Sequence, residues 1–99
     1  MSIYDGKLLI VVSCPGDRDT IYIGRAKRYA DTLQLLGASM ILRYEEVGPG
    51  GLTSQPDKAT RLRPVTAPDG EVLIPLASIS NALVADPAAW KRHLGVSRG

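Results

Sequence analysis

The only cysteine of the chain, Cys14, stands in a short polar segment that follows the apolar run Leu8–Val12 and precedes Arg18. A thiol near an arginine and before a helix N-terminus can have a lowered pKa and react as a thiolate, so Cys14 is the candidate catalytic residue. Free cysteine is also among the most buried residue types, and a structural role is the favoured interpretation. The single histidine, His93, lies far along the chain, so the sequence favours the structural role over a Cys14–His93 dyad.

The residues after Cys14 form a candidate ion-binding segment, made of Gly16, Asp17, Arg18 and Asp19. Backbone N–H groups at a helix start attract anions, and an arginine adds donors. The segment matches neither phosphate-binding glycine motif, and a capped helix start explains it as well. Two aspartates can also bind Mg²⁺, with Glu45 and Glu46 as further ligands if the strand ends are neighbours. Because no third ligand is near in sequence, we expect neither a metal site nor a cofactor.

A basic stretch, Lys58, Arg61 and Arg63, lies beside Pro64 and forms a second candidate binding region. Edge strands commonly carry cations because these prevent strand-to-strand aggregation. The functional alternative is a binding edge for an acidic partner. The preceding residues 48–59 contain three glycines and two prolines, which predicts a flexible loop. Such a loop can serve as a lid, a docking arm or a plain connection.

The elements that must position these residues are read from apolar spacing. Leu8–Val12 is apolar on both faces, which is typical of a central strand covered on both sides. The next apolar residues, Tyr22, Ala26, Tyr29, Leu33 and Leu36, recur with the period of a helix that Gly37 would end. Residues 39–47 alternate and indicate a second strand, parallel to the first through a right-handed crossover.

Residues 61–66 and 71–74 flank the turn residues 67–70, which predicts an antiparallel hairpin. Its first strand should be an edge, because Pro64 cannot donate a ladder hydrogen bond. Residues 78–84 resemble a short helix. A last helix is signalled by Asp86 as N-cap, Pro87 as first residue, and the apolar pair Trp90 and Leu94, with Trp90 as a core anchor.

The expected order is therefore strand-helix-strand-strand-strand-helix-helix, an α/β fold on the border of α+β. We expect one domain over residues 1–99, with a single sheet of about four strands. Residues 96–99 should fray. Ligands of open α/β sheets usually lie beyond the carboxyl ends of the strands, which places Cys14 at such a rim.

This element order, with the pair Cys14-Pro15 after the first strand, resembles thioredoxin and glutaredoxin domains. Asp17 stands where that family has its second cysteine or a serine, and Pro64 stands where it has a cis-proline. The resemblance implies an alternative thioredoxin-like fold with redox activity at Cys14, although the resolving residue is missing. The first 47 residues also resemble the opening strand-helix-strand unit of many nucleotide-binding α/β proteins, without a motif of that class.

Composition narrows the function classes. Twelve Lys and Arg against ten Asp and Glu give a formal charge of +2, which does not predict a nucleic-acid-binding protein. A single cysteine excludes an intramolecular disulfide and favours a reducing compartment. No apolar run approaches the roughly 18 residues of a membrane span, and the N-terminus has no secretory signal. We expect a cytoplasmic protein, in the host cytoplasm if the chain is phage-encoded.

The lack of an assembled catalytic set favours a small binding or regulatory module that docks onto another macromolecule. Inhibitors, adaptors and accessory proteins of phages or mobile elements act in this way. Two alternatives stay open: a thiol-dependent enzyme or redox protein centred on Cys14, and a weak anion-binding or nucleic-acid-binding accessory protein. The expected partner is a protein, and self-association through the proline-bearing edge strand is also open. No membrane partner is expected.

Overall fold

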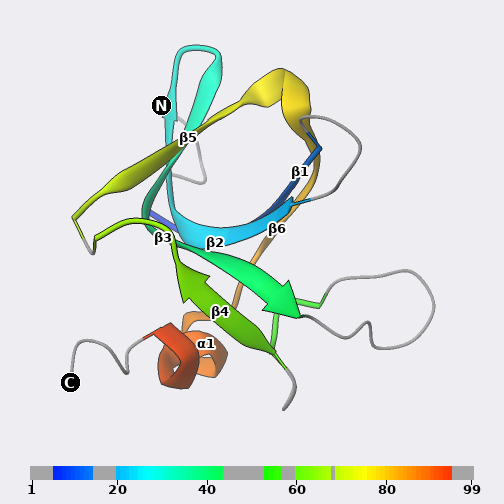
Figure 1. Cartoon of the computed structure of the whole chain (residues 1–99). Helices are drawn as coiled ribbons and strands as arrows, with labels where there is room; N and C mark the ends of the chain where they lie inside the picture. The colour runs from blue at the N-terminus through cyan, green and yellow to red at the C-terminus, as the bar shows by residue number, and fades with distance from the viewer. Residues whose placement is uncertain (1–5, 15–19, 44–52, 57–59, 68, 95–99) are drawn as a thin grey trace.

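The computed structural model describes residues 6–14, 20–43, 53–56, 60–67 and 69–94. Its elements are β1 (Leu8–Ser13), β2 (Thr20–Tyr29), β3 (Thr32–Arg43), β4 (Arg61–Pro64), β5 (Glu71–Pro75), the 3₁₀ turn η1 (Leu76–Ser78), β6 (Ile79–Val84) and α1 (Pro87–Leu94) (Figure 1). Over these described residues the fold is mostly β, with one six-stranded sheet followed by one short helix. The predicted α/β fold is therefore wrong.

All strand pairs of the described chain are antiparallel. The strands follow the order β4-β3-β2-β1-β6, and β5 also pairs with β3. The long β3 serves two neighbours, because residues 32–36 pair with β5 and residues 39–43 pair with β4. The predicted parallel pairing of residues 8–12 with residues 39–47 is wrong, because β2 lies between β1 and β3. Antiparallel pairing of β2 with both neighbours also excludes the thioredoxin-like alternative and the nucleotide-binding resemblance.

A hairpin of β2 and β3 replaces the helix that the sequence predicts over residues 22–36. Ala26 lies opposite Leu35 and Arg28 opposite Leu33, so Ala26, Leu33 and Leu35 can all enter the core. Of the predicted helix face, Tyr22, Ala26 and Leu33 pack in this core, whereas Leu36 is 37% exposed, so the helical spacing is coincidental. The turn between the strands has Ala30 at a φ of 51°, where hairpins normally use glycine, asparagine or aspartate. The sequence therefore lacks the usual signal for this turn.

Two further predicted elements differ. Residues 61–66 and 71–74 do not pair with each other, because β4 and β5 both pair with β3. Residues 79–84 form strand β6 beside β1 in place of a helix. The prediction of an edge strand at Pro64 is confirmed, since β4 ends the strand order. The strand predicted over 39–47 is the end of β3, and residues 44–47 lie outside the described part of the chain.

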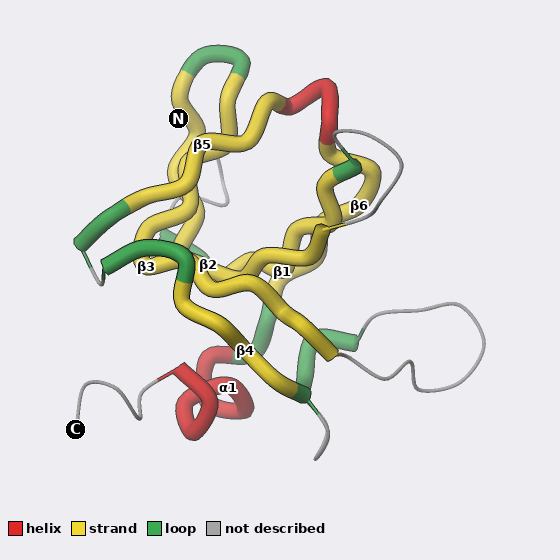
Figure 2. Tube along the Cα trace, viewed as in Figure 1, coloured by secondary structure: helices red, strands yellow, loops and turns green. Residues whose placement is uncertain are grey.

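The sheet curls into a ring that η1 helps to close (Figure 2). The Leu76 N–H donates to the Asp31 carbonyl in the β2–β3 turn at 2.9 Å. On the other side of η1, the Cys14 N–H donates to the Ser78 carbonyl at 2.8 Å. These two bonds link η1 to the β2–β3 turn and to the end of β1.

The fold has two apolar clusters, one on each face of β1. Leu9 and Val11 join a cluster inside the ring with Leu35 and Ile74. Leu8 and Ile10 join a second cluster on the outer face, where Trp90 of α1 covers them together with Ile23, Ile41 and Ala85. The prediction that Leu8–Val12 is a central strand covered on both sides is thus confirmed.

The last helix begins and packs as the sequence predicts. The Ala88 N–H donates to Asp86 Oδ1 at 3.1 Å, which satisfies a backbone donor at the helix start. Trp90 is 0% exposed, and its Nε1 donates to the Ser54 carbonyl at 2.6 Å. The same carbonyl accepts the Asp86 N–H at 3.1 Å, so residues around Ser54 are tied to the helix. No helix among the described residues has the length and apolarity needed to cross a membrane.

Replacing Ile10 with alanine tests the outer cluster. We expect Ile10→Ala to lower the free energy of unfolding by about 2–5 kcal/mol, because a fully buried side chain leaves a cavity under α1. Leu73→Ala is the control, since Leu73 is 56% exposed and its loss should change stability by less than about 0.5 kcal/mol. Urea unfolding followed by Trp90 fluorescence measures both, and equal effects would contradict the assignment.

Replacing Ala30 with glycine distinguishes the observed hairpin from the predicted helix. At a φ of 51° alanine is strained and glycine is not, so Ala30→Gly should raise the free energy of unfolding by about 1 kcal/mol. In a helix interior the same change would lower it by about 1 kcal/mol. Ala82→Gly in strand β6 is the control and should be destabilising. Thermal unfolding gives the sign directly.

Candidate functional site

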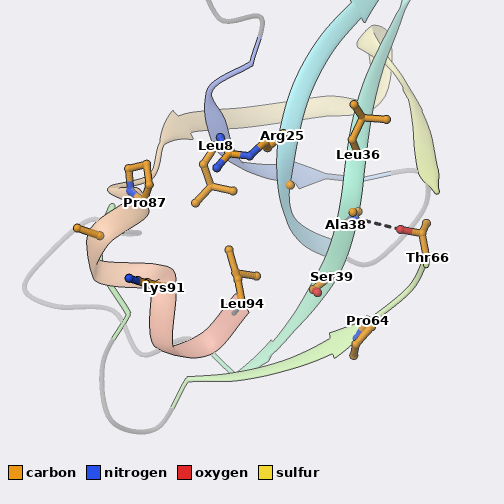
Figure 3. A pocket seen from close by; sticks show the side chains of 13 residues that line it. Leu8, Arg25, Leu36, Ala38, Ser39, Pro64, Thr66, Pro87, Lys91 and Leu94 are labelled. Carbon is orange, nitrogen blue, oxygen red and sulfur yellow. Dashed lines mark hydrogen bonds between the residues drawn. The ribbon is translucent and has the colours of Figure 1, made fainter. Parts of the chain in front are cut away.

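An open groove of about 890 Å³ lies between α1 and the middle of β3 (Figure 3). Pro87, Lys91 and Leu94 of α1 form one wall. Leu36 and residues 37–39 of β3 form the facing wall, with Pro64 and Thr66 continuing it. Leu8 and Arg25 lie at the end between the two walls.

The groove exists because β3 bends at one point along its pairing with β2. Ile23 lies opposite Ser39 and Arg25 opposite Leu36, so the single residue Gly24 faces two residues of β3. This two-against-one arrangement is a β-bulge, which bends the strand that carries the extra residue. The two residues opposite Gly24 are Gly37, at a φ of 59°, and Ala38.

Glycine is required at position 24 because β3 lies very close to the Gly24 backbone. A Cβ atom built on Gly24 would lie 3.1 Å from both the Leu35 Cβ and the Leu36 carbonyl oxygen, and the latter is backbone that cannot rotate away. Glycine therefore allows β2 and β3 to approach closely enough to form the bend.

The segment between β4 and β5 holds the bend from the other side. The Gly37 N–H donates to the Gly70 carbonyl at 2.9 Å, and the Ala38 N–H donates to Thr66 Oγ1 at 3.1 Å. The Ala38 carbonyl accepts the Val65 N–H at 3.1 Å. The backbone N–H groups of the bend therefore have hydrogen-bond partners, and these bonds fix the position of this wall of the groove.

The groove combines an apolar surface with positive charge. Leucine, proline and alanine side chains supply most of its lining, and Leu36 is 37% exposed there. The charged residues of the described lining are Lys91, on the α1 wall, and Arg25, at the end between the walls, and both are exposed. Arg25 Nη1 donates to the Gly6 carbonyl at 3.0 Å, which limits where the guanidinium can lie. No carboxylate belongs to the described lining, so the groove is suited to an amphipathic ligand with negative charge.

Cys14 lies outside this groove. Its side chain is exposed directly after β1, and its backbone N–H is bonded to Ser78 of η1. His93 belongs to α1, where its ring centroid is 5.6 Å from that of Trp90. Because η1 and α1 lie at opposite ends of the curled sheet (Figure 1), the structure does not bring Cys14 and His93 together.

The other residues proposed from the sequence divide into two groups. Gly16, Asp17, Arg18, Asp19 and Lys58, like Glu45 and Glu46, lie outside the described residues. Arg61 and Arg63 are exposed on the edge strand β4, and Arg63 Nη2 lies 3.7 Å from Met40 Sδ. They alternate with Leu62, which packs toward α1, so they face away from the groove. Within the described ranges, no three His, Cys, Asp or Glu side chains gather as a metal site would require.

The groove residues were missed because the sequence pattern was interpreted with the wrong period. As part of a helix, Arg25 would lie on a solvated polar face. The β-branched residues Ile21 and Ile23, followed by the alternation of Arg25 and Lys27 with Gly24 and Ala26, are the signal that could have found the strand. Lys91 carries no such signal, because its role depends on how α1 packs.

Gly24→Ala tests the origin of the groove. The new Cβ meets the backbone of β3, so we expect the free energy of unfolding to fall by about 1–3 kcal/mol. Amide chemical shifts should change most at residues 35–38. Lys27→Ala, an exposed change on the same strand, should leave both measurements nearly unaltered. A Gly24→Ala variant as stable as the parent would contradict the close approach of β2 and β3.

Comparisons with protein-family models, with curated proteins and with solved structures found no match. Any function proposed for the chain therefore rests on its own geometry.

Proposed function

We propose that the protein is a binding module whose groove between α1 and β3 receives an acidic, amphipathic segment of a partner protein. The observation that carries this proposal is an apolar lining with Lys91 on one wall and Arg25 at the end of the groove, and with no carboxylate among the described lining residues. Apolar side chains of the ligand would cover the leucines and prolines. Its carboxylates would meet the two cations.

A protein segment suits this groove better than a small molecule. Small-molecule sites bury most of the ligand surface, whereas this groove is an open one. Helix-in-groove recognition uses such open apolar surfaces, with anchors on one face of an amphipathic helix. A helix of the partner, acidic on its exposed flanks, would satisfy both the apolar lining and the cations.

Charge favours a protein partner over a nucleic acid. The described lining of the groove offers two cations, and the chain as a whole has a formal charge of only +2. Nucleic-acid affinity depends chiefly on the number of phosphates that basic residues neutralise. Two cations above apolar side chains are better matched to a few carboxylates flanking apolar anchors.

A matched pair of peptides tests the proposal. One is an amphipathic helix of about twelve residues with leucine anchors and glutamate elsewhere, and the other has lysine in place of each glutamate. We expect the acidic peptide alone to bind, with affinity falling as salt rises, because exposed charges are screened. Fluorescence anisotropy of labelled peptides measures both, and a single-stranded DNA oligonucleotide of the same length is a third probe.

Neighbouring residues of α1 provide the matched variants. Lys91→Glu should weaken the acidic peptide about fivefold, which corresponds to about 1 kcal/mol. Arg92→Glu makes the same charge change on an exposed residue outside the groove and should have little effect. Binding of both peptides alike, equal loss in the two variants, preference for the oligonucleotide or no peptide binding would each overturn the proposal.

A further inference from the structure

We propose that strand β6 pairs antiparallel with β6 of a second copy of this chain, forming a two-fold symmetric dimer. In the part of the chain that the structure describes, β6 pairs with β1 and has no strand on its other side. Its residues Ser80, Asn81, Ala82 and Val84 are exposed, and Val84 is 42% exposed. The occupant proposed for this edge is a second copy, because the β6 edge contains neither a charge nor a proline whereas the other edge strands contain both.

The backbone of β6 directs specific groups outward. The Ala85 N–H donates to the Leu8 carbonyl at 2.8 Å, which fixes the alternation of the ladder. Leu83 therefore turns its backbone groups toward β1, and Ala82 and Val84 turn theirs away. The Ala82 N–H confirms this direction, because it donates to the Asn81 side-chain oxygen at 2.9 Å and not to β1.

The three outer edges of the sheet differ in composition. β4 carries two arginines and a proline, and β5 begins at Glu71 and ends at Pro75. Charges and prolines are the usual protection of an edge against pairing. β6, with the sequence ISNALV, contains neither a charge nor a proline.

The same comparison excludes self-pairing through β4. Arg61 and Arg63 are exposed there, and a second copy would bring its own arginines beside them. An antiparallel β6 pair brings no like charges together. A strand edge is also complementary to itself under two-fold symmetry, the commonest symmetry of protein dimers.

One register fits the outward groups. With the axis at Leu83, Ala82 of each copy lies opposite Val84 of the other, and their N–H and C=O groups exchange hydrogen bonds. This register leaves out Ser80, whose hydroxyl donates to the Val12 carbonyl at 3.3 Å beside the bulge in β1 pairing. A partner carbonyl would replace the Asn81 side chain as acceptor of the Ala82 N–H.

Sedimentation equilibrium of the full chain tests the dimer. Across about 5 to 500 µM we expect the average mass to rise toward twice that of the chain, because dimer population depends on concentration. Ala82→Lys with Val84→Lys places like charges across the axis. Ala82→Glu with Val84→Lys places opposite charges there, at the same exposed positions. We expect the second double variant to dimerise at least about tenfold more tightly than the first.

Two further variants keep the test sharp. Asn81→Ala removes the local acceptor of the Ala82 N–H and should tighten the dimer by about threefold, which a merely exposed asparagine would not do. Leu73→Lys adds a charge at an exposed position on β5 and should not change the dimer constant. A monomer at all concentrations, equal dimer constants for the two double variants, or loss of the dimer in Leu73→Lys would overturn the proposal.

Discussion

The structure depends on the burial of β1 on both faces. Leu9 and Val11 enter the ring of strands, while Leu8 and Ile10 lie beneath Trp90. Each face of one six-residue strand therefore holds a separate apolar cluster. A chain without phenylalanine has few large side chains, so placing its one tryptophan over the outer face supplies much of the cover that this face needs.

The groove follows from the same arrangement. Helix α1 is held against the outer face by Trp90 and by the two hydrogen bonds to the Ser54 carbonyl. The bend at Gly37 divides β3 into a half that closes the ring with β5 and a half that pairs with β4. Helix α1 faces this bend across an open space. Lys91 of the helix and Arg25 of β2 both line that space, so they belong to one groove.

Local signals explain which elements were predictable. The apolar run at Leu8 and the cap, proline and tryptophan of α1 are strong signals that do not depend on distant contacts, and both elements were predicted. The β2–β3 hairpin was not, because its turn uses Ala30 and its core residues imitate a helical period. The pairing of β5 with β3 depends on the bend at Gly37, and no local pattern encodes which strand a segment will join.

The candidate site was less predictable than the fold. Cys14 attracted attention because its side chain is reactive, yet the structure places it beside η1, away from His93 and the groove. Arg61 and Arg63 do lie on an exposed edge as predicted, which fits protection of that edge. Arg25 and Lys91 line the same groove only because α1 packs against the sheet. They are far apart in the sequence, so no local pattern predicts that they share a site.

The most direct test of this account is a map of proton–proton contacts from β1 methyl groups, measured by nuclear Overhauser spectroscopy. The Ile10 methyl groups should contact the Trp90 ring, and the Val11 methyl groups should contact Leu35 or Ile74 and not the tryptophan. Contacts from both neighbours to the Trp90 ring, or from neither, would contradict a strand covered by two separate clusters.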